Sequence, residues 1–136
     1  MINIKINELR VGNYAGIASS LDFKIGTVTA ISKKRLLLEI DNTVYSSSNC
    51  KIVPLETTSD RLIDLGFKKQ KALNFIPCYV IKSKKEGIFF TIYEHEVGVY
   101  TVHANNFDIK CNYIHQLQNI FFFSTGEELV FSSTEL

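Results

Sequence analysis

Short alternating runs of β-branched and apolar residues constrain the first 55 residues of the chain more than any other feature. Thr27, Thr29 and Ile31 alternate with Val28 and Ala30. A period of two residues is the pattern of a β-strand that buries one of its faces. This part of the chain is therefore predicted to be a β-sheet.

Polar turns divide the same region into short pieces. Residues 32–34 and 41–42 lie between apolar runs, and a third polar segment at 47–49 precedes a last short run at 50–55. Five short strands with tight turns are typical of a small, strongly bent barrel. We therefore predict an SH3-like small β-barrel for residues 1–55.

The rest of the chain, residues 56–136, is predicted to contain a helix, an antiparallel β-meander and a C-terminal packing helix. The meander is indicated by three β-rich runs at 72–83, 87–96 and 97–104, with a hairpin turn at 84–87 and a last short run at 128–133. This order of elements is typical of an α+β fold. The two parts, 1–55 and 56–136, are expected to form one compact unit.

The first helix is predicted at residues 57–66. Thr57 or Thr58 is expected to cap its N-terminus, with Asp60 in the capping-box position relative to Thr57. Gly66 is expected to end the helix, because glycine readily takes a positive φ. The residues expected on its buried side are Leu62, Ile63 and Leu65.

The second helix is predicted to begin near Tyr113 and to end at Gly126. With about 3.6 residues per turn, its apolar side chains gather on one side. The predicted core side contains Tyr113, Ile114, Leu117, Ile120, Phe121 and Ser124. The side chains predicted away from the core, as a patch for docking a partner protein, are His115, Gln118, Asn119, Phe122 and Phe123. The other interpretation is that neighbouring strands or the run at 128–133 cover the two phenylalanines.

Charge is distributed unevenly along a chain whose net charge is only +1. Residues 1–86 contain 14 Lys/Arg and 8 Asp/Glu, whereas residues 87–136 contain one Lys and 6 Asp/Glu. The lysine clusters are either solvated turns or contacts to nucleic-acid phosphates. The basic residues concerned are Lys33, Lys34, Arg35, Lys68, Lys69, Lys71, Lys82, Lys84 and Lys85.

The cysteines and histidines give little indication of catalysis. Three dispersed cysteines suit reduced thiols in a cytoplasmic protein better than a disulfide scaffold. Neither they nor the three histidines have the spacing of a metal site, so we expect no metal and no cofactor. Cys111 and His115 are four residues apart, which leaves a Cys/His hydrolase as a remote alternative. No signal peptide or membrane span is predicted.

Three segments carry a family resemblance: NELRVGNYAGI at 7–17, IVPLETTSDRLIDLGF at 52–67, and YIHQLQNIFFFSTGEEL at 113–129. Through them the chain resembles a family of small uncharacterised proteins that is common in Bacteroidetes genomes and in their phages and prophages. The last segment is the most specific. The family has no assigned reaction, so the resemblance implies no catalytic residue.

The resemblance implies a setting in a phage or other mobile element. Small accessory proteins in that setting commonly act by stoichiometric binding, and many of them inhibit host defence. We therefore expect a non-enzymatic interaction protein whose partner is a protein or a ribonucleoprotein, in the manner of an anti-CRISPR inhibitor. The alternative is a small nucleic-acid-binding barrel that uses the lysine clusters at its turns.

Overall fold

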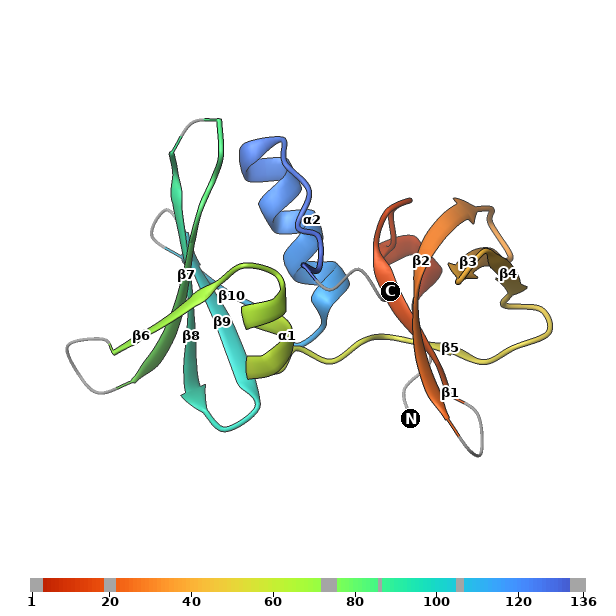
Figure 1. Cartoon of the computed structure of the whole chain (residues 1–136), viewed down its shortest axis with the longest axis horizontal. Helices are drawn as coiled ribbons and strands as arrows, with labels where there is room; N and C mark the ends of the chain where they lie inside the picture. Colours follow the sequence, from red (N-terminus) through yellow and green to blue (C-terminus); the bar gives the residue numbers. More distant parts are fainter. Residues whose placement is uncertain (1–3, 19–21, 72–75, 86, 105–106, 133–136) are drawn as a thin grey trace. The chain divides into compact units, whose positions relative to one another are not determined.

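The structure is a computed structural model that describes residues 4–18, 22–71, 76–85, 87–104 and 107–132. In this part of the chain, two five-stranded antiparallel sheets are accompanied by two α-helices and a short 3-10 helix, which confirms the α+β class (Figure 1). The chain divides into two compact units. The first contains Met1–Leu55 and Tyr113–Asn119, and the second contains Glu56–Asn112 and Ile120–Thr134.

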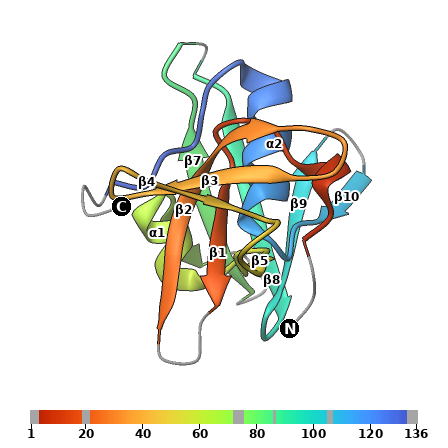
Figure 2. The same cartoon turned by 90° about the vertical axis from the view of Figure 1, so that its right-hand side faces the viewer.

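The first unit contains the five strands predicted for residues 1–55, in the order β4-β3-β2-β1-β5. The long strand β2 pairs with β1 through its first part and with β3 through its second, with a bulge between Val28 and Ala30. Figure 2 shows β1 and β2 side by side, with β3 and β4 running across them. The strands are β1 (Tyr14–Ala18), β2 (Phe23–Ile31), β3 (Leu36–Ile40), β4 (Thr43–Ser46) and β5 (Ile52–Val53).

Two local features shape this sheet. Asp41 and Asn42 both have positive φ, and a two-residue loop of this kind matches the twist of a β-hairpin. Gly26 lies where a Cβ would be 2.7 Å from the Glu39 carbonyl oxygen, so glycine lets β2 and β3 approach closely. The core beneath them consists of Ala15, Val28, Leu36, Leu38, Ile40 and Ile52.

Strands β4 and β5 form the two edges of the first sheet. In the described part of the chain the sheet is therefore open, and the closed SH3-like barrel stays a prediction. The short helix η1 (Ile6–Glu8) precedes β1, and its Ile6 packs against the core together with Ile4 and Leu9.

The second unit contains a sheet in the order β10-β9-β8-β7-β6. Three of its strands correspond to the predicted meander. The edge strands β6 and β10 were not predicted, and the predicted run at 128–133 is not a strand in its described residues, 128–132. The strands are β6 (Lys68–Lys71), β7 (Pro77–Lys82), β8 (Phe89–Glu96), β9 (Val99–Ala104) and β10 (Phe107–Lys110). In the predicted turn at 84–87, Glu86 lies outside the described residues.

Helix α1 (Ser59–Asp64) is shorter than the predicted range of 57–66, and two of its residues differ from the prediction. The Thr58 hydroxyl accepts a hydrogen bond from the Arg61 backbone N–H at 3.2 Å, so Thr58 is the cap. At the other end Gly66 has a positive φ and its N–H donates to Ile63, while Phe67 N–H donates to Leu62, which is a Schellman motif. One difference is Asp60, which is two residues after the Thr58 cap and therefore not in the capping-box position. The other is Ile63, which is 51% exposed because it faces away from the buried Leu62 side.

Helix α2 (Ile114–Thr125) contributes residues to both units. Its buried side includes Ile114, Leu117 and Phe121, as predicted. Ser124, which was predicted to be on that side, is exposed. Gly126 follows the helix with a positive φ, and its N–H donates to the Phe122 carbonyl oxygen at 2.7 Å. Neither α1 nor α2 has the length and hydropathy of a membrane span, and the search covered the described residues.

Candidate functional site

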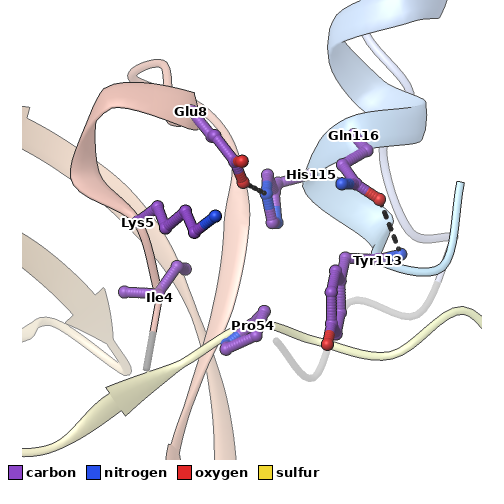
Figure 3. Close-up of a pocket in the computed structure, with 7 residues that line it drawn as sticks. All are labelled: Ile4, Lys5, Glu8, Pro54, Tyr113, His115 and Gln116. Carbon is purple, nitrogen blue, oxygen red and sulfur yellow. Dashed lines mark hydrogen bonds and ion pairs between the residues drawn. The ribbon is translucent and has the colours of Figure 1, made fainter. Parts of the chain in front are cut away.

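A cavity of about 250 Å³ in the first unit lies at the beginning of α2. The residues that line it come from η1 and the segment before it, from Pro54 after β5, and from the first residues of α2. Figure 3 shows the polar ends of Lys5, Glu8 and Gln116 on the side of the cavity where His115 lies. The lining residues are Ile4, Lys5, Glu8, Pro54, Tyr113, His115 and Gln116.

His115 is the buried polar group of this cavity, with 1% of its surface exposed. Its Nε2 lies 3.5 Å from Glu8 Oε2, and neither ring nitrogen has a hydrogen-bond partner in the described part of the chain. Its ring stacks on Tyr113 with 5.9 Å between centroids. Burial lowers the pKa of His115 below its ordinary value, and the nearby Glu8 carboxylate opposes this shift.

The burial of His115 contradicts the prediction that it lies on an exposed side of the helix. Gln118 is also buried, because its Oε1 accepts a hydrogen bond from Tyr14 N–H at 2.8 Å and its Nε2 donates to the Gly12 carbonyl at 3.3 Å. Asn119 accepts hydrogen bonds from Asn13 and Arg10 and donates one to the Glu8 carbonyl. These side chains satisfy polar groups of the turn before β1, which a helical wheel does not show.

Cys111, the cysteine of the predicted Cys/His pair, lacks the exposed setting of a reactive thiol. Cys111 is buried, and burial raises the pKa of its thiol to about 12, so it stays protonated near neutral pH. It also lies before the first residue of α2, so the predicted helical i,i+4 relation to His115 does not exist. Cys50 and Cys78 are free thiols as well. No cluster of metal-ligating side chains occurs among the described residues.

A second candidate site is one face of the sheet in the second unit. Because directly paired residues of a sheet share a face, the strand register defines this face. We call it the outer face, because the contacts of the sheet with Ser59 of α1 and Phe121 of α2 go to Tyr79 and Phe90 on the other face. Its rows are Lys68, Val80, Thr91, His103 and Asp108; Gln70, Cys78, Tyr93, Thr101 and Lys110; Lys82 with Phe89; and Glu96 with Val99.

Aromatic rings and cations alternate on the outer face. Phe89 is 67% exposed, and the Lys82 ammonium lies 5.6 Å from its ring centroid. Further along β8, the Tyr93 ring lies 6.3 Å from His103 and 5.8 Å from His95, which is on the bulge of this strand. The residues that the register places on this face include three lysines and two carboxylates, Glu96 opposite Val99 and Asp108, which is 2.6 Å from His103 Nδ1.

The predicted basic residues are divided by the fold. Lys33, Lys34 and Arg35 are exposed at the turn between β2 and β3 of the first unit, whereas the other six belong to the second unit. Of these six, Lys68 and Lys82 are on the outer face. Lys69 and Lys71 alternate with Lys68 along β6, and the Lys69 ammonium lies 5.9 Å from the centroid of the Tyr79 ring. Lys84 and Lys85 are in the β7–β8 turn, where their backbone N–H groups donate to the Glu127 carboxylate.

The two phenylalanines of the predicted patch have different surroundings. Phe123 is 78% exposed, and Phe122 is half-buried with its ring 6.1 Å from that of Phe123. The segment after α2 packs elsewhere in the second unit: Leu129 and Phe131 are buried, and Ser132 hydrogen-bonds to Asp64 of α1. Of the predicted patch, the two phenylalanines remain, since the half-buried Asn119 uses its side-chain amide in hydrogen bonds within the first unit.

Sequence reasoning missed Phe89, Tyr93, His103 and Lys110 as site residues. A signal for two of them was present, because Phe89 and Tyr93 alternate with buried Phe90 and Ile92 along β8. His103 and Lys110 join them only through strand pairing, which the sequence does not give.

No protein-family model matches the chain, and neither a curated protein nor a solved structure matches it. The resemblance to the Bacteroidetes family therefore stays a prediction.

Proposed function

We propose that this protein acts by binding rather than by catalysis, and that the outer face of the second sheet binds single-stranded nucleic acid. The observation that carries the proposal is the exposed Phe89 ring beside the Lys82 ammonium, with Tyr93 four residues further along the same strand. Single-strand binders stack bases on aromatic rings and hold the phosphates with cations. The outer face offers both groups on one surface.

Charge favours nucleic acid over a protein as the occupant. Lys68, Lys82 and Lys110 are exposed on the outer face. The register also places two carboxylates there: Asp108, which is paired with His103, and Glu96, which lies opposite Val99 beyond the bulge at the end of β8. Phe89 and Tyr93 are about 13 Å apart along β8, from the rise of about 3.3 Å per residue. This spacing leaves room for two non-adjacent bases, with phosphates between them.

The sequence resemblance implies that the protein belongs to a mobile element, and on this basis we extend the proposal to a partner. The protein would act as a stoichiometric inhibitor of a host-defence ribonucleoprotein, and the outer face would contact the RNA of that complex. The test is capture from a host extract with the intact chain and with a Phe89→Ala/Tyr93→Ala variant. We expect the intact chain to capture an RNA-containing complex and the variant to lose it. Capture that is equal for both chains would reject this extension.

Binding itself is tested by fluorescence anisotropy with labelled single-stranded RNA and DNA at several salt concentrations. We expect the Phe89→Ala/Tyr93→Ala variant to raise the Kd by about 5- to 150-fold for each stacked base lost. Lys82→Ala should reduce the negative slope of log K against log salt by about 0.7, the value for one phosphate contact on a single strand.

Two matched controls remove the same residue types elsewhere. Phe123→Ala removes an exposed aromatic ring that is not on the outer face, and Lys33→Ala/Lys34→Ala removes two exposed cations of the first unit. Both should leave the Kd unchanged. The proposal is wrong if no oligonucleotide binds at low salt, if the controls weaken binding as much as the outer-face variants, or if the outer-face variants lose only a protein partner.

A further inference from the structure

The His115 cavity has no role in the function proposed above, and its residues indicate a ligand of a different kind. His115 is almost completely buried, its Nδ1 has no hydrogen-bond partner in the described part of the chain, and its Nε2 has only the long 3.5 Å contact with the Glu8 carboxylate. A buried polar group normally has a partner, because leaving it unpaired costs about 1–3 kcal/mol. The ring lines a cavity of about 250 Å³, so a molecule bound there could supply the partners.

The charges on the cavity wall define the chemistry of that molecule. Lys5 contributes an ammonium group and Glu8 a carboxylate, and both line the cavity together with His115 (Figure 3). A ligand with a single charge would leave one of these two groups facing a like charge. A zwitterion satisfies both, since each of its charged groups meets the opposite charge.

The remaining walls add one donor group and an apolar surface. The Gln116 Oε1 accepts a hydrogen bond from Tyr113 N–H, which leaves the side-chain NH₂ of Gln116 as a donor at the cavity. Ile4, Pro54 and the Tyr113 ring supply the apolar part. Such a wall suits an apolar side chain on the zwitterion.

We propose that this cavity binds a free α-amino acid with an apolar side chain. Lys5 and the Gln116 amide bind its carboxylate, and Glu8 binds its ammonium group with His115 as a further hydrogen-bond partner. The side chain of the amino acid lies against Ile4, Pro54 and Tyr113. This site belongs wholly to the first unit and does not depend on nucleic-acid binding by the second.

The test is calorimetric titration of the full-length chain with the standard amino acids, supported by amide chemical shifts. We expect saturable binding of an apolar amino acid, with shifts at the residues lining the cavity. An analogue that lacks the ammonium group, and another whose carboxylate is an amide, should each bind about tenfold or more weakly, because each loses a charge-assisted hydrogen bond.

Two variants test which side chain of the cavity binds each charged group of the amino acid. Glu8→Gln should weaken binding of the parent amino acid but not of the analogue without the ammonium group. Lys5→Met should weaken binding of the parent amino acid but not of the analogue whose carboxylate is an amide. Glu8 is 43% exposed, so its replacement should leave the fold intact, which the thermal unfolding curve checks. Lys24→Met, at an exposed position of β2, is the control. The proposal is overturned if no amino acid binds, if both analogues bind as well as the parent, or if the control weakens binding equally.

Discussion

The two halves of helix α2 are packed by different chemistry, although they belong to one continuous helix. The first half, in the first unit, buries His115 and Gln118, and Gln118 hydrogen-bonds to the backbone of the turn before β1. The second half, in the second unit, buries Phe121, whose ring meets Phe90 edge to face at 5.4 Å. The first half also buries Ile114 and Leu117, so the two halves differ in the buried polar side chains of the first and the aromatic packing of the second.

The difference shows what decides whether a helical side chain is buried. Polarity alone predicts exposure, yet the turn before β1 has buried backbone groups that need partners, and Gln118 supplies them. Where the neighbouring surface is an apolar sheet face, an aromatic side chain is buried instead. The partner surface, and not the helix sequence alone, therefore determines the buried side.

The aromatic half should be the more sensitive to truncation. Phe121→Ala removes a ring that is 2% exposed, and a change of this kind usually lowers the free energy of unfolding by about 3–5 kcal/mol. Urea denaturation followed by circular dichroism measures it. Phe123→Ala, which truncates a ring that is 78% exposed on the same helix, should change the free energy by less than about 0.5 kcal/mol. Equal effects of the two variants would contradict the assignment of Phe121 to the core.

The polar half should give a smaller effect of a different kind. Gln118→Met keeps the approximate size of the side chain but leaves Tyr14 N–H and the Gly12 carbonyl without this partner. We expect the free energy of unfolding to fall by about 1–3 kcal/mol, the cost of an unpaired buried polar group. Hydrogen exchange at the Tyr14 amide should accelerate as well. If Gln118→Met is as stable as the parent and the Tyr14 amide stays protected, this hydrogen bond does not hold the two segments together.

Much of this fold follows from local sequence. The alternation around Val28, the Asp41–Asn42 turn and the Gly66 helix end all agree with the structure, because each depends on neighbouring residues. Strand β6 was missed because its sequence, KKQK, has no apolar side chain, and an edge strand needs only one partner strand. The same limit applies to the outer face, since only the pairing of β8 with β9 and β7 brings Tyr93 and Phe89 beside His103 and Lys82.

The buried His115 should make the stability of the first unit depend on pH. Burial lowers the pKa of His115 from its ordinary value of 6.5, so the folded chain holds this proton less readily than the unfolded chain. Below about pH 6.5 unfolding takes up a proton, and stability must therefore fall as the pH falls from that value towards the lower pKa of the folded state. The melting temperature between about pH 7.5 and about pH 5.5 measures this.

Two variants isolate His115 from the other titrating groups. His115→Gln removes the titrating ring, so its melting temperature should depend less on pH in this range than that of the parent chain. Glu8→Gln removes the carboxylate that opposes the effect of burial, which lowers the pKa of His115 further and extends the loss of stability to lower pH. A parent and a His115→Gln chain with parallel pH profiles would show that the ring does not titrate differently on folding. The polar half of α2 would then be insensitive to charge, as the aromatic half around Phe121 is.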